Sequence, residues 1–142
     1  SSDVCSSDLM TEKLDLYRCK ICGNMVQIIL NGFGELVCCG EAMEKVEPNT
    51  QENVTTEYHI PVYITDDNGF TSIQVGKELH PMTSEHHIEF IERISDDKTC
   101  MSLKYLNINE EPRIELQHKV NSEKAIEMCN LHGLWEGRND KQ

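Results

Sequence analysis

The chain has 142 residues, enough for one ordinary domain or for a very small domain joined to one of roughly 95 residues. Its formal net charge of −12 would repel phosphate backbones, so we expect no nucleic-acid partner. No apolar run approaches the roughly 20 residues that span a bilayer, and no secretory pattern follows Met10, so we expect no membrane association. We therefore predict a cytoplasmic protein, in which paired cysteines bind metal rather than form disulfides.

Residues 1–9 read SSDVCSSDL, which resembles the in-frame translation of a sequencing-library adapter. We predict that they form a non-native leader, with a natural leader as the alternative. Met10 then opens an ordinary N-terminus, MTEKLDLYRC, and six of the seven cysteines follow it.

Residues 10–46 are predicted to form a small, metal-stabilised β domain. Residues 26–30 and 35–37 have the composition of short strands, and the glycine-containing stretch between them supplies a turn. About 40 residues rarely bury enough apolar surface to fold alone. Four thiols in this segment can supply the missing stability by binding zinc or iron. They are Cys19, Cys22, Cys38 and Cys39.

The spacing of these cysteines leaves two metals open. A CxxC pair followed by glycine is typical of structural zinc ribbons. The adjacent pair Cys38 and Cys39 is unusual there, because neighbouring side chains normally point apart. This pair favours an iron site.

Residues 47–56 (EPNTQENVTT) are polar and lack apolar periodicity, so we predict a linker. From residue 57 to residue 142, short segments with period-two alternation are separated by turns, a pattern typical of an antiparallel β-sandwich. Residues 66–69 (DDNG) are a strong hairpin signal. The fold class is therefore all-β. The expected strands are residues 58–65, 70–75, 87–94, 100–106, 113–120 and 123–128.

Five candidate metal ligands stand beside turns and prolines in this second segment. Each alone has an ordinary explanation, since a lone histidine is usually a surface or hydrogen-bonded residue. Together they offer four neutral nitrogens and one thiolate, a set that suits iron, zinc or copper. They are His59, His80, His86, Cys129 and His132.

The order of these motifs resembles the desulfoferrodoxin family of two-iron superoxide reductases. The shared pattern is CxxC, CC, ExHxP, HPM, a histidine six residues later and CNxHGxW, and it extends from Tyr17 to Trp135. The resemblance implies a desulforedoxin-like first domain and an immunoglobulin-like β-sandwich, each with one iron. It assigns the first iron to Cys19, Cys22, Cys38 and Cys39. It assigns the second to an equatorial set of His59, His80, His86 and His132, with Cys129 axial.

The resemblance also gives Glu57 the role of a gate at the sixth iron position, where the alternative is a solvated acidic side chain. The family usually has lysine directly before the first ligand histidine, and Tyr58 stands there in this chain. A tyrosine carries no positive charge at neutral pH, so it cannot attract superoxide as lysine would. Lys77, three residues before His80, is a candidate replacement.

We therefore expect an oxidoreductase that reduces superoxide to hydrogen peroxide at the second iron. The resemblance implies a rubredoxin-like electron donor and a homodimer. One alternative is a non-catalytic metal-binding or electron-transfer protein with zinc or iron in the four-cysteine site. Another is a superoxide dismutase, whose oxidative half-reaction an electron-rich thiolate site should perform poorly. The donors predicted not to bind metal are His87, His118 and Cys100, the last as a small core residue.

Overall fold

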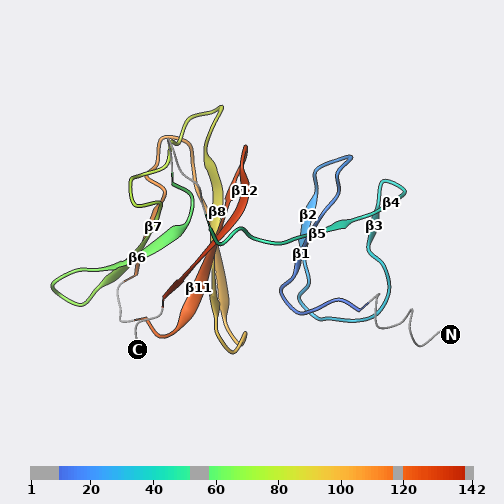
Figure 1. The fold of residues 1–142 in the computed structure, drawn as a ribbon, viewed down its shortest axis with the longest axis horizontal. Helices are drawn as coiled ribbons and strands as arrows, with labels where there is room; N and C mark the ends of the chain where they lie inside the picture. Colours follow the sequence, from blue (N-terminus) through green and yellow to red (C-terminus); the bar gives the residue numbers. More distant parts are fainter. Residues whose placement is uncertain (1–9, 52–57, 117–119, 140–142) are drawn as a thin grey trace. The chain divides into compact units, whose positions relative to one another are not determined.

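The computed structural model describes residues 10–51, 58–116 and 120–139. The chain divides into two compact units, one ending at Glu47 and the other beginning at Pro48 (Figure 1). All regular secondary structure in the described ranges is β, so the predicted all-β class is confirmed. A membrane-spanning helix is accordingly not found within these ranges.

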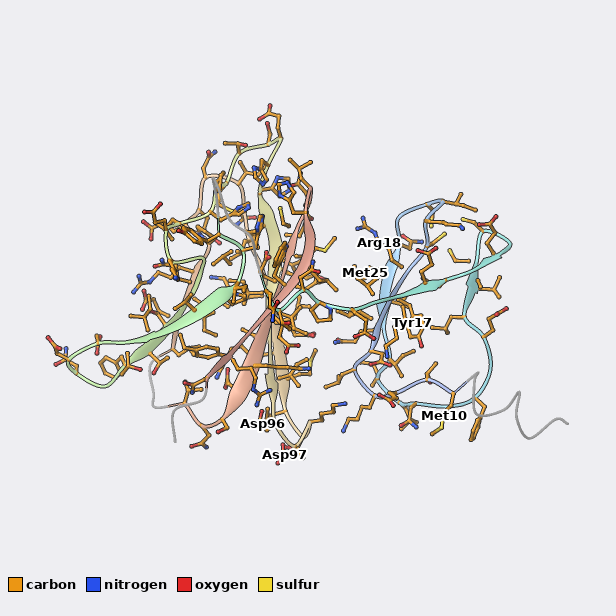
Figure 2. The ribbon with its side chains drawn as sticks, in the orientation of Figure 1. Met10, Tyr17, Arg18, Met25, Asp96 and Asp97 are labelled. Atoms are coloured by element: carbon orange, nitrogen blue, oxygen red, sulfur yellow. The ribbon has the colours of Figure 1, made fainter. Side chains whose placement is uncertain are left out.

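The first unit is built from five very short strands. Strand β1 (Leu16–Arg18) lies between β2 (Met25–Gln27) and β5 (Glu44–Val46), with antiparallel pairing on both sides. A separate two-stranded ladder joins β3 (Val37–Cys38) to β4 (Glu41–Ala42). Side chains radiate from this small frame, including those labelled Tyr17, Arg18 and Met25 in Figure 2.

Very little of the first unit is buried. Among its described residues only Thr11, Leu16 and Cys19 fall in the buried class. Leu30 is 87% exposed, and several other large apolar side chains are also exposed. These others are Met10, Ile21, Val26, Ile29, Phe33 and Val37. A unit with so small a core needs another source of folding free energy.

The second unit consists of two antiparallel sheets. The larger has the order β12-β11-β8-β9 and the smaller β10-β7-β6. The strands are β6 (Pro61–Thr65), β7 (Thr71–Val75), β8 (Ile88–Ser95), β9 (Met101–Tyr105), β10 (Arg113–Leu116), β11 (Glu123–Cys129) and β12 (Gly133–Asn139). Asn49, in the predicted linker, forms a parallel bridge with Trp135 of β12.

The core of this unit lies between the sheets and reaches the end of β11. Ile73 and Val75 from one sheet meet Ile91 and Ala125 from the other, and all four are fully buried. Cys129, the last residue of β11, belongs to the same cluster and has no exposed surface. Its thiol therefore sits at the boundary between the apolar core and the loops beyond it.

A hydrogen-bonded cluster of polar side chains also joins the two sheets. The Tyr63 hydroxyl of β6 donates to Glu123 Oε2 of β11 at 2.7 Å, and Arg93 of β8 donates two hydrogen bonds of 2.8 Å to the same carboxylate. Desolvation and the bond to Glu123 raise the pKa of the Tyr63 phenol. The phenol therefore stays protonated and remains a donor.

The turn between β8 and β9 shows why one prediction was wrong. Asp97 lies in this turn (Figure 2). Hydrogen bonds from Thr99 and Ser95 to Asp97 shape the turn and lower the pKa of Asp97 to about 2. The Cys100 amide donates a hydrogen bond to Ser95 Oγ at the end of this turn, and the Cys100 side chain is exposed. Cys100 is not a core residue, because it precedes the first paired position of β9.

Candidate metal centres

The first unit gathers its four cysteines into one group. The sulfur atoms of Cys19, Cys22, Cys38 and Cys39 all lie within 4.8 Å of one another. Four sulfurs bound tetrahedrally at about 2.3 Å to one ion would lie about 3.8 Å apart. The sulfurs of Cys22 and Cys38 are 3.5 Å apart, and those of Cys38 and Cys39 are 3.9 Å apart. The group therefore fits a single tetrahedral metal ion.

Local backbone geometry turns these sulfurs inward. The Cys22 amide donates to Cys19 Sγ at 3.4 Å, and Gly23 with φ +83° completes that turn. At the vicinal pair, Cys39 itself adopts a left-handed conformation with φ +54°. Adjacent side chains usually diverge in an extended chain, and this conformation is what lets both sulfurs face the same point.

The thiols of this group hold their protons unequally. The bond from the Cys22 amide lowers the pKa of Cys19 to about 6, whereas hydrogen bonds with Cys22 and Cys19 raise the pKa of Cys38 to about 12. Without metal, the Cys19 thiol therefore ionises readily, whereas the Cys38 thiol keeps its proton. A bound cation would replace that proton, and loading would release it to solvent.

Removing the metal is expected to unfold the first unit alone. Its few buried residues cannot offset the conformational entropy of about 37 residues, whereas the second unit keeps an extensive core. Hydrogen exchange measured by mass spectrometry after chelation should show full exchange across residues 11–46 and retained protection in β8 and β11. Retained protection in residues 11–46 would mean that the metal is not needed for folding.

In the second unit four imidazoles follow one another in a closed ring. Ring centroids are 4.8 Å apart for His59 and His80, 4.5 Å for His80 and His86, 5.1 Å for His86 and His132, and 4.9 Å for His132 and His59. Three of these four contacts are edge-to-face, and the fourth is tilted. Edge-to-face neighbours can all direct one nitrogen toward a common centre.

The Cys129 sulfur completes this group. It lies 3.7 Å from His80 Nε2 and 3.6 Å from His132 Nδ1, and His59 Nε2 is 3.1 Å from that Nδ1. The ligand atoms of His59, His80, His86 and Cys129 lie within 4.8 Å of one another. Two donors on opposite sides of one ion, each bound at about 2.1 to 2.3 Å, lie about 4.2 to 4.6 Å apart, so a group of this size is compact enough to share one metal.

The donors come from three parts of the fold. His59 lies two residues before the start of β6, and His80 and His86 lie in the loop between β7 and β8. Cys129 and His132 flank the turn from β11 to β12. A register shift between β8 and β11 occurs just before Cys129, which moves the sulfur out of the regular ladder.

Asn130 connects two of these parts by hydrogen bonds, a role that its sequence context does not predict. Its side-chain oxygen accepts from the His87 amide at 2.9 Å, and its side-chain nitrogen donates to the Glu85 carbonyl at 3.0 Å. Its own amide donates to the His87 carbonyl at 3.1 Å. The turn that carries Cys129 and His132 is thereby held against the loop that carries His86.

Two further contacts fix the imidazoles. Trp135 stacks on His59 at 4.7 Å between ring centroids with an interplanar angle of 13°, and its indole donates to the His132 carbonyl at 3.1 Å. His80 Nδ1 lies 2.8 Å from the Pro81 carbonyl. A carbonyl can only accept, so Nδ1 carries the proton and Nε2, which lies 3.7 Å from the Cys129 sulfur, keeps the lone pair that can bind metal.

The other candidate residues lie apart from this group. His87, predicted as a non-ligand, contacts the Thr83 carbonyl at 2.8 Å and the Glu89 carboxylate at 2.5 Å. Lys77 is exposed and places its ammonium 5.8 Å from the centre of the Tyr58 ring. The predictions for Glu57 and His118 lie outside the described residues.

Comparison with known proteins decides the family. The family model described as the N-terminal domain of desulfoferrodoxin matches residues 11–46, and the model described as desulfoferrodoxin matches residues 50–138. The chain belongs to the desulfoferrodoxin family. It is 37% identical over 130 residues to a desulfoferrodoxin of Desulfarculus baarsii, which covers 92% of this chain and 100% of that protein.

One further relative of this desulfoferrodoxin-family chain and one solved structure of similar fold are superoxide reductases. One from Pyrococcus horikoshii is 32% identical over 96 residues, covering 56% of this chain and 84% of the relative. The crystal structure of the superoxide reductase from Treponema pallidum aligns with a TM-score of 0.62 and 24% identity, covering 89% of this chain and 99% of that one. The latter supports the fold, and the two donor groups suit the family's two iron centres.

Proposed function

We propose that the chain is a superoxide reductase, which converts superoxide, one electron and two protons into hydrogen peroxide. The observation that carries this proposal is the ring of four imidazoles closed by the buried Cys129 sulfur. Iron accepts six donors, and five from the protein leave one for substrate, which is the usual mark of a catalytic site. Bound ferrous iron would supply the single electron.

The residues of the second centre have different proposed roles. His59, His80, His86 and His132 would hold the metal through neutral nitrogens, and the Cys129 thiolate would add electron density and favour electron release. Burial of Cys129 keeps this sulfur away from solvent oxidants. Trp135 and the Pro81 carbonyl keep two of the imidazoles in their binding orientations.

Glu57 is proposed as the group that helps product leave the centre. It lies two residues before His59 in the sequence, and its carboxylate would compete with the anionic product for the open position. In Glu57→Ala we expect altered absorption of the oxidised centre and slower release of peroxide. An unchanged spectrum with unchanged release would remove Glu57 from the mechanism.

The proposal also includes a metal in the first centre, an electron donor and a second copy of the chain. Cys19, Cys22, Cys38 and Cys39 would hold a second iron, and a rubredoxin-like protein would deliver electrons. We further propose a homodimer working in the cytoplasm. The exposed apolar side chains of the first unit, such as Leu30 and Phe33, support association, because large exposed apolar patches commonly mark interaction sites.

Metal analysis with pulsed superoxide tests the function directly. We expect two iron ions per chain, a red ferric four-cysteine centre and a blue to green colour when the second centre is oxidised. Each superoxide consumed by the reduced protein should yield one hydrogen peroxide without oxygen. Oxygen release would instead indicate dismutation, and a colourless, zinc-loaded protein without turnover would indicate a non-catalytic metal-binding module.

A further inference from the structure

The turn that follows β7 packs directly on the residues on both sides of His59. The Gly76 amide donates to the Ile60 carbonyl at 3.1 Å, and the side-chain amide of Gln74 donates to the carbonyls of Gly76 and Lys77 at 3.0 and 3.1 Å. Gly76 and Gln74 are both buried. The backbone of Lys77 is therefore fixed, although its side chain is exposed.

Gly76 makes this close approach possible. It has φ +82°, and a Cβ atom at this position would lie 2.7 Å from the Tyr58 carbonyl oxygen and 2.8 Å from Tyr58 Cβ. Any larger residue would push the turn away from Tyr58. The sequence Gly76-Lys77 thus places a lysine immediately beside the residue that precedes His59.

The Lys77 ammonium lies over the face of the Tyr58 ring. The distance from Nζ to the ring centroid is 5.8 Å, within the range of a cation–π contact. Lys77 forms no ion pair with any carboxylate in the described ranges, although exposed Glu78 follows it in the chain. The ring therefore gives this exposed side chain a preferred position.

We propose that Tyr58 is a positioning residue that holds the Lys77 ammonium beside the second metal centre, where it attracts the superoxide anion. The inference rests on the proposed function and adds a mechanism for substrate capture. A chain with net charge −12 repels anions at long range, so capture needs a local positive charge near the open position. His59 follows Tyr58, and His80 lies three residues after Lys77, so both partners of the contact lie within three residues of proposed ligands in the sequence.

Paired charge variants test the position of this ammonium in the iron-loaded protein. Lys77→Ala and Lys98→Ala change the net charge equally, but Lys98 lies in the turn beyond Ser95, at the end of β8 away from the metal ligands. In Lys77→Ala we expect the second-order rate with superoxide at low salt to fall about fivefold, the effect of one unit charge a few ångströms away in water. The rate should also lose its decrease with rising ionic strength. Lys98→Ala should keep both properties, and Lys77→Arg should restore them.

Azide binding to the oxidised centre, followed by absorption, provides a readout that does not depend on turnover. Lys77→Ala should weaken azide binding by a similar factor, while its spectrum without azide stays unchanged. Tyr58→Leu, which removes the ring, should resemble Lys77→Ala in both assays, and Tyr58→Phe should resemble the parent protein. These comparisons separate loss of the ring from loss of the hydroxyl.

The outcomes distinguish the two proposals. If the parent protein binds azide in a Lys77-dependent way but does not reduce superoxide, the proposed function fails and the anion-attracting role of Lys77 stands. If it reduces superoxide and Lys77→Ala equals Lys98→Ala in rate, salt dependence and azide affinity, the role of Lys77 is overturned. If Tyr58→Leu leaves these three quantities unchanged while Lys77→Ala lowers them, Tyr58 does not position the lysine.

Discussion

Replacing Cys129 by alanine is expected to lower the rate of superoxide reduction by more than about 100-fold. Changes to residues that only support metal ligands typically cost about 10- to 100-fold, and the loss of a proposed direct ligand should cost more. Alanine is preferred to serine because Cys129 has no exposed surface and a hydroxyl would be buried in an apolar cluster. The measurement is pulsed superoxide together with absorption of the oxidised protein.

The spectrum makes this experiment specific. The blue to green band of the second centre should disappear in Cys129→Ala, while the red colour of the four-cysteine centre in the other unit should persist. Cys100→Ala is the matched control, because Cys100 is exposed in the turn before β9. A Cys129→Ala protein that kept both the band and the rate would show that the sulfur is not a ligand.

Gly137→Ala is expected to destabilise the second unit by about 3 kcal/mol or more, at the upper end of overpacking effects. Gly137 lies in the middle of β12, where a Cβ atom would meet the Pro61 carbonyl oxygen of β6 at 2.0 Å and Ile60 Cγ2 at 3.2 Å. Backbone cannot rotate away as a side chain can, so β12 and β6 would have to separate. Urea unfolding of the iron-loaded protein, followed by tryptophan emission, measures the loss.

This substitution should also weaken the metal centre. β6 begins two residues after His59, and β12 begins directly after His132, so separation of these strands would draw two proposed ligands apart. Gly32→Ala is the control, since a Cβ at Gly32 would meet nothing within 4 Å. Equal stability of Gly137→Ala and the parent protein would mean that the sheets tolerate a wider spacing than the packing implies.

The sequence predicted most strands of the second unit because their alternation is clear, but β12 was missed. Its sequence, GLWEGRN, contains two glycines and two charged residues and shows no apolar alternation. Its position depends on tertiary contacts: it pairs with β11 along seven residues, and Gly137 sits against β6. The burial of Glu92 could not be predicted either, because Phe90 and Ile94 on the same face of the strand predict an apolar face without a carboxylate.

The candidate metal ligands could be found from residue types and motif order, whereas the residues that hold them could not. Asn130 looked like part of a motif, and only the structure shows that it bonds to both His87 and Glu85. Contacts of this kind join residues more than 40 positions apart and leave no local signal. The error at Cys100 has a similar origin, because a cysteine beside a strand is equally consistent with core and with surface.

The stacking of Trp135 on His59 has a practical consequence, because Trp135 is the only tryptophan in the chain. Its indole lies against a proposed ligand of the second metal centre, so fluorescence excited in the indole band reports on that centre directly. A coloured oxidised centre at this range should quench the emission by energy transfer, and reduction or metal loss should restore it. The protein thus contains a built-in optical probe of its own oxidation state.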